Sequence, residues 1–198
     1  KLQIILAQPD AASICASLAN AVAAGAREAG HAVQIADIVA EGFDPRFGQA
    51  DLDCYHGHGP VPDDVLREQA RINGADALVL VFPVYWWSLP AILKGWIDRV
   101  FIGGWAFKFD NGAVVGTMRQ IPVVLIGTGG GNDAGYVKHG YYTAFETQVT
   151  KGIFNFCGLE RVDTRLMLEV EGKDAELRKA YLEEARAIGR ELLATSGQ

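Results

Sequence analysis

Residues 77–90 read ALVLVFPVYWWSLP, and this stretch decides the fold that we predict. Its first half, Ala77 to Phe82, is a continuous apolar run with the length of a fully buried strand. Three consecutive aromatic residues follow, bracketed by two prolines, and residues 90–100 then have the spacing of an amphipathic helix. Ligands of open α/β sheets bind at the carboxyl ends of the strands. Strand packing does not require three rings in such a loop, so the loop is a candidate wall for a flat, apolar ligand.

Apolar runs and helical segments alternate on either side of this stretch. We expect strands at residues 2–7, 31–38, 77–82, 121–127 and 161–168, and helices at 13–29, 63–75, 90–100, 142–157 and 173–194. Segments 42–62 and 103–119 lack periodicity and are expected to be irregular loops, and a glycine-rich loop spans 128–135. This alternation predicts an α/β protein with a parallel sheet, helices on both faces and a single domain over residues 1–198.

The bulk composition excludes several classes of protein. The chain has 198 residues, of which 49% are hydrophobic and 21% charged, as in a globular domain with a sizeable core. Its net charge of −6 argues against binding nucleic acid, which usually requires a basic stripe. No apolar run reaches the roughly 18 residues of a membrane span, and no leader peptide is visible. Cys15, Cys54 and Cys157 have no regular spacing, which favours a reduced, cytoplasmic protein.

The loop after the first strand separates two doubly wound alternatives. A Rossmann dinucleotide fold requires G-x-G-x-x-G at this point. The chain instead has Gln8-Pro9-Asp10-Ala11-Ala12-Ser13, without a glycine. This loop fits better with a flavodoxin-like three-layer sandwich, whose five parallel strands have the order 2-1-3-4-5. The phosphate of a flavin would then lie on the free amides at the start of the first helix.

One long motif resembles a known family. The run Phe82-Pro83-x-x-Trp86-x-x-x-Pro90-Ala91-Ile92-Leu93-Lys94-Gly95-Trp96-Ile97-Asp98-Arg99-Val100-Phe101 resembles the NAD(P)H:quinone oxidoreductases of the flavodoxin-like superfamily. The similarity continues through Thr128-Gly129-Gly130 and Phe156-Cys157-Gly158 and covers essentially the whole chain. Within the family, the chain looks more like the short bacterial members than the mammalian enzymes.

The resemblance implies three groups of flavin contacts. The aromatic loop would lie along the isoalloxazine ring, the loop after the fourth strand would cover its polar edge, and the loop after the first strand would bind phosphate. These groups are, in that order, Pro83, Val84, Tyr85, Trp86 and Trp87; Gly127, Thr128, Gly129 and Gly130; and Gln8, Ser13, Ile14 and Cys15. The family usually has His in place of Gln8, which can donate a hydrogen bond but carries no charge. The resemblance favours FAD, because the 42–62 segment could cover an adenosine half, and leaves FMN open.

The resemblance also implies catalytic and lid residues. Tyr136 and His139 would lie near the N1 and O2 side of the flavin as catalytic groups, with Tyr142 as the substitute if the loop is shifted. The aromatics Trp105, Phe107 and Phe109, joined by Phe156, form either a short hairpin face on the core or a lid. As a lid they would cross a dimer axis and cover the partner's flavin and substrate.

These features together predict a flavin-dependent NAD(P)H dehydrogenase (quinone). It would be a homodimer that passes a hydride from NAD(P)H to a quinone-like acceptor by a ping-pong mechanism. The alternative functions are a flavodoxin-like electron carrier, a regulatory flavoprotein subunit of a potassium efflux system, and an azo- or nitroreductase. His56 and His58, near Asp51 and Asp53, have a poor spacing for a tetrahedral metal site, so no metal is expected.

Overall fold

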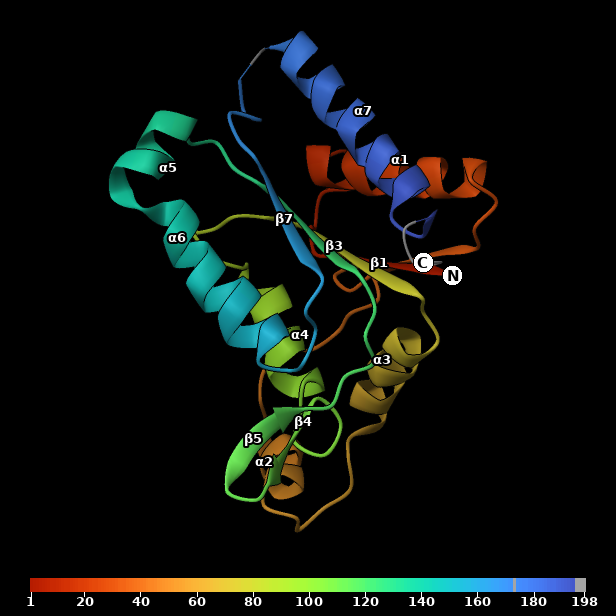
Figure 1. The fold of residues 1–198 in the computed structure, drawn as a ribbon, viewed down its shortest axis with the longest axis vertical. Helices are drawn as coiled ribbons and strands as arrows, with labels where there is room; N and C mark the ends of the chain where they lie inside the picture. The colour runs from red at the N-terminus through yellow and green to blue at the C-terminus, as the bar shows by residue number, and fades with distance from the viewer. Residues whose placement is uncertain (173, 195–198) are drawn as a thin grey trace.

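A five-stranded parallel sheet forms the centre of the protein (Figure 1). The structure is a computed structural model that describes residues 1–172 and 174–194. The strands are β1 (Leu2–Leu6), β2 (Val33–Asp37), β3 (Ala77–Pro83), β6 (Val123–Thr128) and β7 (Val162–Met167). Their order, β2-β1-β3-β6-β7, is the predicted order 2-1-3-4-5, because β4 and β5 form a separate hairpin. The flavodoxin-like prediction is therefore confirmed.

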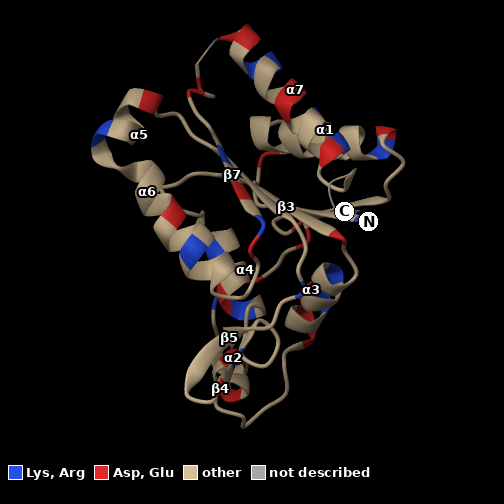
Figure 2. Ribbon diagram, viewed as in Figure 1, with Lys and Arg blue, Asp and Glu red and all other residues tan. Residues whose placement is uncertain are grey.

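Helices cover both faces of the sheet (Figure 1). One face carries α1 (Ile14–Glu28) and α7 (Ala175–Glu191), and the other carries α3 (Asp63–Asn73), α4 (Ala91–Val100), α6 (Tyr141–Phe145) and the π-helix η1 (Glu146–Asn155). Lys173, the first residue of the last predicted helix, lies outside the described residues. Figure 2 shows lysines and arginines alternating with acidic residues along α3 and α7. Within residues 1–172 and 174–194, no helix combines the length and apolar character that a membrane crossing requires.

The side chains of β3 alternate between two hydrophobic cores, as expected for a strand buried on both sides. Val79 and Val81 contact the core under α1 and α7, whereas Leu80 and its neighbours on that face pack against α4 and η1. Trp96 of α4 is fully buried in this second core, and its indole N–H donates to Glu68 at 3.0 Å. Trp96 therefore serves packing, whereas Trp86 and Trp87, in the loop before α4, belong to neither core.

Two segments predicted as irregular loops contain regular structure. The prediction for 42–62 is corrected, whereas 103–119 contains the short hairpin that was one of the two alternatives for its aromatic residues. Segment 42–62 holds the helix α2 (Gln49–Tyr55), which is too short to show helical periodicity. Segment 103–119 holds a hairpin of β4 (Phe107–Asp110) and β5 (Ala113–Gly116). Asn111 and Gly112 join these strands with φ of 49° and 82°, the backbone of a two-residue hairpin turn.

The region after β6 also differs from the prediction. The glycine-rich loop ends at α5 (Asp133–His139), capped by the Asn132 side chain, which accepts a hydrogen bond from Gly135 N–H. Residues 142–157 were predicted as one α-helix, but α6 is short and continues as the π-helix η1. Apolar periodicity does not distinguish the two helix types, because both bury one side against the sheet.

A buried ionic cluster ties α4 to the segment between β2 and α3. Arg99 donates from Nε to Asp51 of α2 at 2.9 Å and from a terminal nitrogen to Asp64 of α3 at 2.6 Å. The same guanidinium donates to the carbonyl oxygen of Asp44 at 2.8 Å. Arg99 and Asp51 are each only 6% exposed. We call these three residues, Arg99, Asp51 and Asp64, the Arg99 cluster. Asp51, one of the acids considered above as a metal ligand, is thus paired with Arg99.

Candidate functional site

A cavity of about 380 Å³ lies at the carboxyl ends of β1, β3 and β6. It is lined by Gln8, Ala12, Ser13, Ile14, Pro83, Val84, Tyr85, Thr128, Gly129, Gly130, Val170, Glu171 and Arg178. Nine of the thirteen residues predicted for cofactor binding line it: three from the first loop, three from the aromatic loop and three from the glycine loop. The sheet therefore brings together three loops that are far apart in the sequence.

The first wall is the loop that leads into α1. Ser13 is the N-cap, and its hydroxyl accepts a hydrogen bond from Ala16 N–H at 3.2 Å. Gln8 stabilises the loop by accepting from Asp10 N–H at 3.2 Å. The amides of Ile14 and Cys15, in the first turn, have no partner within the helix, so they can bind an anion. The Cys15 side chain is turned away, fully buried, with Sγ 3.1 Å from Thr128 Oγ1, and burial raises the pKa of its thiol.

The second wall is a two-residue turn that presents the tryptophans. Tyr85 and Ser88 exchange backbone hydrogen bonds of 3.1 and 3.0 Å around Trp86 and Trp87. Both tryptophans have left-handed φ, 50° and 56°. That conformation costs an L-residue roughly 1–2 kcal/mol each, so the turn stores strain. Tyr85 lines the cavity, whereas the predicted contacts Trp86 and Trp87 are not part of its lining and are 87% and 40% exposed.

The third wall is the glycine loop after β6. A side chain at Gly127 would force its neighbours to shift, because a Cβ there would lie 2.8 Å from the Leu166 side chain and 2.9 Å from that of Val84. Gly129 N–H donates to the carbonyl of Met167 at 3.0 Å, which removes this amide as a free donor. Gly130 N–H has no acceptor among residues 1–172 and 174–194. Of the two amides, Gly130 is therefore the one that can bind a ligand.

Tyr136 lies behind the glycine loop, in α5. Its side chain is 5% exposed, and its hydroxyl oxygen lies 3.3 Å from the point where a Cβ on Gly129 would be. Burial raises the pKa of this phenol, so it stays protonated and able to donate near neutral pH. His139 is exposed at the end of α5, outside the cavity lining, and stacks on Tyr141 with 5.4 Å between ring centroids. Tyr142 donates from its hydroxyl to Asp133 at 2.8 Å, and burial together with this acid raises its pKa to about 12.

The sequence reasoning missed the fourth wall, which comes from the segment after β7. Val170, Glu171 and Arg178 line the cavity there. The Glu171 carboxylate covers Gly130, since a Cβ on that glycine would lie 2.8 Å from it. Arg178, in the first turns of α7, donates to the carbonyl of Val170 at 2.8 Å. Because β7 runs parallel to β6, whatever follows it reaches the same edge, and this signal could have found these residues.

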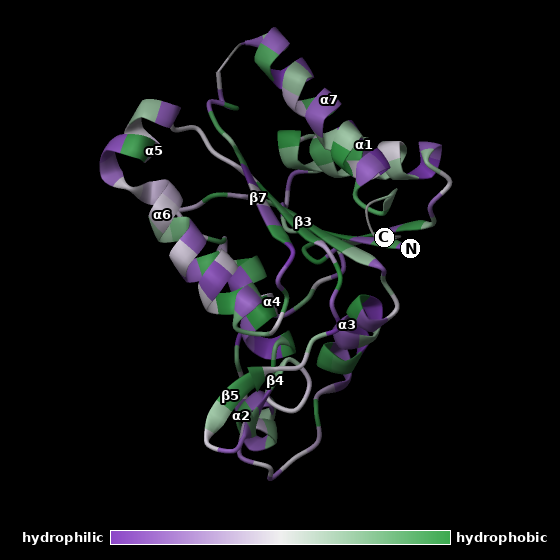
Figure 3. Ribbon diagram, in the orientation of Figure 1, coloured by the Kyte–Doolittle hydropathy of each residue, from purple (hydrophilic) through white to green (hydrophobic). Residues whose placement is uncertain are grey.

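The predicted lid residues do not reach this cavity within one chain. The hairpin and α2 lie at the end of the molecule opposite α7 (Figure 1), and Figure 3 shows apolar residues on the hairpin strands. Phe107 contacts Phe156 at 5.4 Å between centroids, and Phe107 and Phe109 line a second cavity, of about 630 Å³, with Tyr55 and Cys54. We call Tyr55, Phe107, Phe109 and Phe156 the hairpin face. Phe109 is 78% and Tyr55 74% exposed. Trp105 lies apart from it and donates to Asn73 at 3.2 Å.

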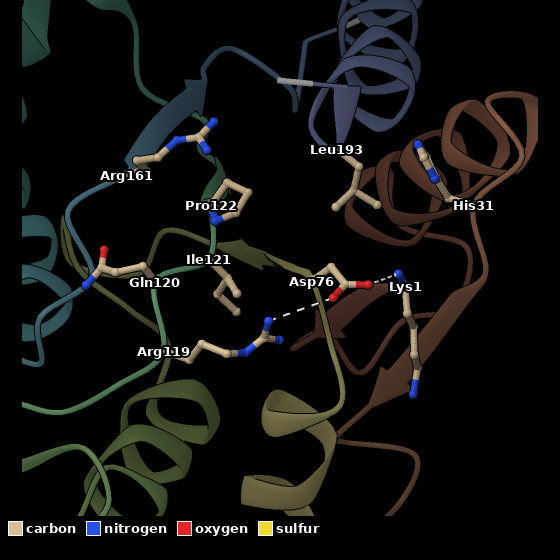
Figure 4. A pocket seen from close by; sticks show the side chains of 9 residues that line it. All are labelled: Lys1, His31, Asp76, Arg119, Gln120, Ile121, Pro122, Arg161 and Leu193. Carbon is tan, nitrogen blue, oxygen red and sulfur yellow. Dashed lines mark hydrogen bonds and ion pairs between the residues drawn. The ribbon is translucent and has the colours of Figure 1, made fainter. Parts of the chain in front are cut away.

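Another cavity lies at the amino-terminal edge of the sheet (Figure 4). Asp76, at its centre, accepts a hydrogen bond from the backbone amino group of Lys1 and pairs with Arg119 at 3.8 Å. Apart from Leu193, which follows α7, the residues around it precede the strands, and none belongs to the aromatic or glycine loops. The carboxyl edge is therefore the better candidate for a ligand site.

Comparisons with known proteins agree with this geometry. A family model described as flavodoxin-like fold matches residues 1–188. An uncharacterized NAD(P)H oxidoreductase of Haemophilus influenzae is 33% identical over 181 residues, which cover 91% of this chain and 89% of that protein. A ribosyldihydronicotinamide dehydrogenase (quinone) of Pongo abelii is 29% identical, with 92% and 87% covered.

A solved structure gives the same result in three dimensions. An NAD(P)H:quinone oxidoreductase from Methanothermobacter marburgensis superimposes with a TM-score of 0.87 at 27% identity, over 96% of this chain and 94% of that one. Sequence relatives, structural relatives and the strand order agree with one another. The chain therefore belongs to the family of NAD(P)H oxidoreductases that have the flavodoxin-like fold.

Proposed function

We propose that this protein is a flavin-dependent NAD(P)H:quinone oxidoreductase. The observation that carries the proposal is the carboxyl-edge cavity, in which a helix N-terminus, an aromatic turn and a glycine loop meet. The donors fit a flavin nucleotide: the first-turn amides of α1 suit a phosphate, and the free Gly130 amide suits the polar edge of a ring. Gly130 has no Cβ, so its backbone could approach the ring closely once the flexible Glu171 side chain that covers it moved aside.

A bound flavin would supply the two-electron chemistry, and the protein would supply orientation and electrostatics. The Pro83–Tyr85 backbone would hold one side of the cavity flat. The Gly130 amide would stabilise negative charge that develops at the polar edge, as donors in oxyanion holes do. Tyr136 would keep its proton and donate from behind the loop. His139 remains a proposed proton source, which a movement of the α5 end would have to bring nearer to the cavity. NAD(P)H and acceptor would use one slot in turn, by a ping-pong mechanism.

The proposal is tested with the purified yellow protein under anaerobic conditions. NADPH is expected to bleach the flavin within seconds, and menadione is expected to restore the colour. Reciprocal plots at several NADPH concentrations are expected to be parallel. Intersecting lines would contradict the single-slot mechanism, while absence of bleaching by NADPH and NADH would favour an electron carrier or a regulatory flavoprotein subunit. If NADPH bleaches the flavin but the reduced protein passes electrons only to azo or nitro compounds, the protein is an azo- or nitroreductase.

Whether the flavin is FAD or FMN depends on whether the protein can cover an adenosine. Segment 42–62 lies beside the hairpin in its own chain, so it can cover an adenosine only across a dimer. FAD is therefore proposed together with the dimer, and FMN is the alternative. Mass spectrometry of the flavin released by heating distinguishes them. The three free cysteines fit the reducing cytoplasm, which we propose as the location.

The hairpin face supports a homodimer in which each chain caps the partner's site. Large exposed apolar patches mark interaction surfaces, and Phe109 and Tyr55 are the most exposed rings of this one. Phe109→Asp is expected to raise the dimer dissociation constant by about tenfold or more, the effect of losing one interfacial hot spot. Light scattering over a dilution series measures it. Val137→Asp, at another exposed apolar position on α5, is the matched control. A wild-type protein that is monomeric at every concentration would overturn the dimer.

A further inference from the structure

The strained Trp86–Trp87 turn is held from outside by two residues of the helical segment after α5. Trp87 stacks on Tyr141 with 4.3 Å between ring centroids and an interplanar angle of 26°. Ser88 donates from its hydroxyl to Gln148 Oε1 at 2.6 Å. Tyr141 is the first residue of α6 and Gln148 lies in η1. Both contacts therefore bridge segments that are more than 50 residues apart in the sequence.

These contacts are not needed to attach the helices to the core. Phe145, fully buried in α6, stacks on Phe82 of β3 at 6.2 Å between centroids, and the buried Val149 anchors η1. Trp87 remains 40% exposed in spite of its stack, and neither tryptophan belongs to the two cores. The stack and the Ser88 hydrogen bond thus stabilise the turn rather than the fold.

What the turn presents is the Trp86 side chain. The indole of Trp86 contacts only the edge of Trp87 among the described aromatic rings, at 5.7 Å and 65°. Its neighbour Tyr85 lines the cavity. A large, rigid and mostly exposed ring therefore directly follows a residue of the cavity lining, and it is available to stack on another ring. Without Tyr141 and Gln148, the turn would keep its two Tyr85–Ser88 backbone hydrogen bonds but lose the contacts that fix the Trp87 ring and the Ser88 hydroxyl. The Trp86 indole, which contacts the edge of Trp87, would then be free to move.

We propose that Tyr141 and Gln148 are positioning residues that set Trp86 as one wall of the slot for flat, aromatic acceptors. The inference rests on the proposed quinone reductase function and deepens it. On this proposal, the protein prefers planar bicyclic acceptors because they stack on Trp86, and Tyr141 and Gln148 keep Trp86 in position. The conservative variants Tyr141→Phe and Gln148→Glu keep the ring and the acceptor oxygen, whereas Tyr141→Leu and Gln148→Met lose them.

Steady-state kinetics with menadione test the slot. Tyr141→Leu is expected to raise KM for menadione about fivefold, the size of one lost aromatic contact. Because Tyr141 also contacts Tyr136 and His139, kcat is compared in Gln148→Met, where it should stay within about twofold of the wild type. Gln148→Met should act in the same direction, and Tyr141→Phe and Gln148→Glu should match the wild type. KM for ferricyanide, which has no ring to stack, should not change. In a Trp86→Ala background, Tyr141→Leu should have no additional effect on KM. Additive effects, or equal changes for ferricyanide, would overturn the proposal.

A spectroscopic measurement separates this inference from the proposed function. The coupled Trp86–Trp87 pair gives an exciton band in circular dichroism, which Tyr141→Leu should weaken and Tyr141→Phe should preserve. An unchanged band in Tyr141→Leu would overturn the positioning role even in an active quinone reductase. A wild-type protein that reduces no quinone would overturn the proposed function, and with it the acceptor slot, whatever the band shows.

Discussion

Arg99→Met is expected to lower the free energy of unfolding by about 3–5 kcal/mol, because it leaves the buried Asp51 carboxylate without its partner. Methionine keeps the apolar stem of the side chain but loses the donors to Asp51, Asp64 and the Asp44 carbonyl. Urea denaturation, followed by circular dichroism at neutral pH, measures the change. The loss should also loosen α2, which the Arg99 cluster attaches to α4, and so weaken the hairpin face.

A double variant tests whether the unpaired Asp51 carboxylate causes the loss of stability. Asp51→Asn in the Arg99→Met background removes the charge and keeps an oxygen to accept from Gly48 N–H, the contact that caps α2. We expect it to recover at least half of the lost stability, as replacing both members of a buried pair usually costs less than removing one. A double variant that is no more stable than Arg99→Met would show that packing, and not charge, dominates.

The acid limb of the stability curve gives an independent check. The hydrogen bond from Arg99 holds the pKa of Asp64 below its ordinary value of 3.8. A carboxyl whose pKa is lowered in the folded state contributes stability above its unfolded pKa and loses it as the pH falls through the folded pKa. The wild type should therefore lose part of its stability below about pH 3.8, and Arg99→Met should lose less over the same interval. If the free energy of unfolding falls equally steeply with pH in both proteins, Arg99 does not stabilise the ionised Asp64.

The sequence is sufficient for the sheet but not for the short elements around it. The three central strands β1, β3 and β6 are largely apolar and buried on both faces, and β3 is found from residues 77–82 alone. The edge strands β2 and β7 are only partly buried. By contrast, α2 is stabilised by the cap at Gly48 and by Arg99, which is 48 residues from Asp51. No local pattern contains that contact. The hairpin was predictable, because Asn111-Gly112 is a strong signal for a two-residue turn.

The candidate site divides in the same way. Gln8, Pro83 and Thr128 could be named in advance, since each lies at or just after the carboxyl end of a strand. Glu171 could be found by the same rule applied to β7. The left-handed backbone of Trp86 could not, because tryptophan rarely adopts this conformation and no glycine or asparagine marks the turn. The separation of the hairpin face from the cavity is also beyond local patterns, because it depends on how the 103–119 segment folds back on itself.

Ile14→Pro is expected to weaken flavin binding by about 10- to 100-fold, the loss of one hydrogen bond to a charged group, about 1.5–3 kcal/mol. Ile14 is the first residue of α1, where proline is tolerated, and Ser13 already has the extended backbone (φ −66°, ψ 162°) that a following proline favours. The variant thus removes one first-turn amide and leaves the helix in place. Fluorescence titration of the flavin-stripped protein measures the affinity.

The matched control separates the amide from the side chain. Ile14→Ala keeps the N–H and loses the half-buried aliphatic group that packs beside the α1–α7 core, so it should reduce stability slightly and keep most of the flavin affinity. Ile14→Pro should show the reverse pattern. If both variants weaken flavin binding equally, the side chain and not the amide is responsible, and the phosphate must lie elsewhere. If neither does, the α1 N-terminus has no part in binding, and the fit between this cavity and a flavin nucleotide fails at its charged end.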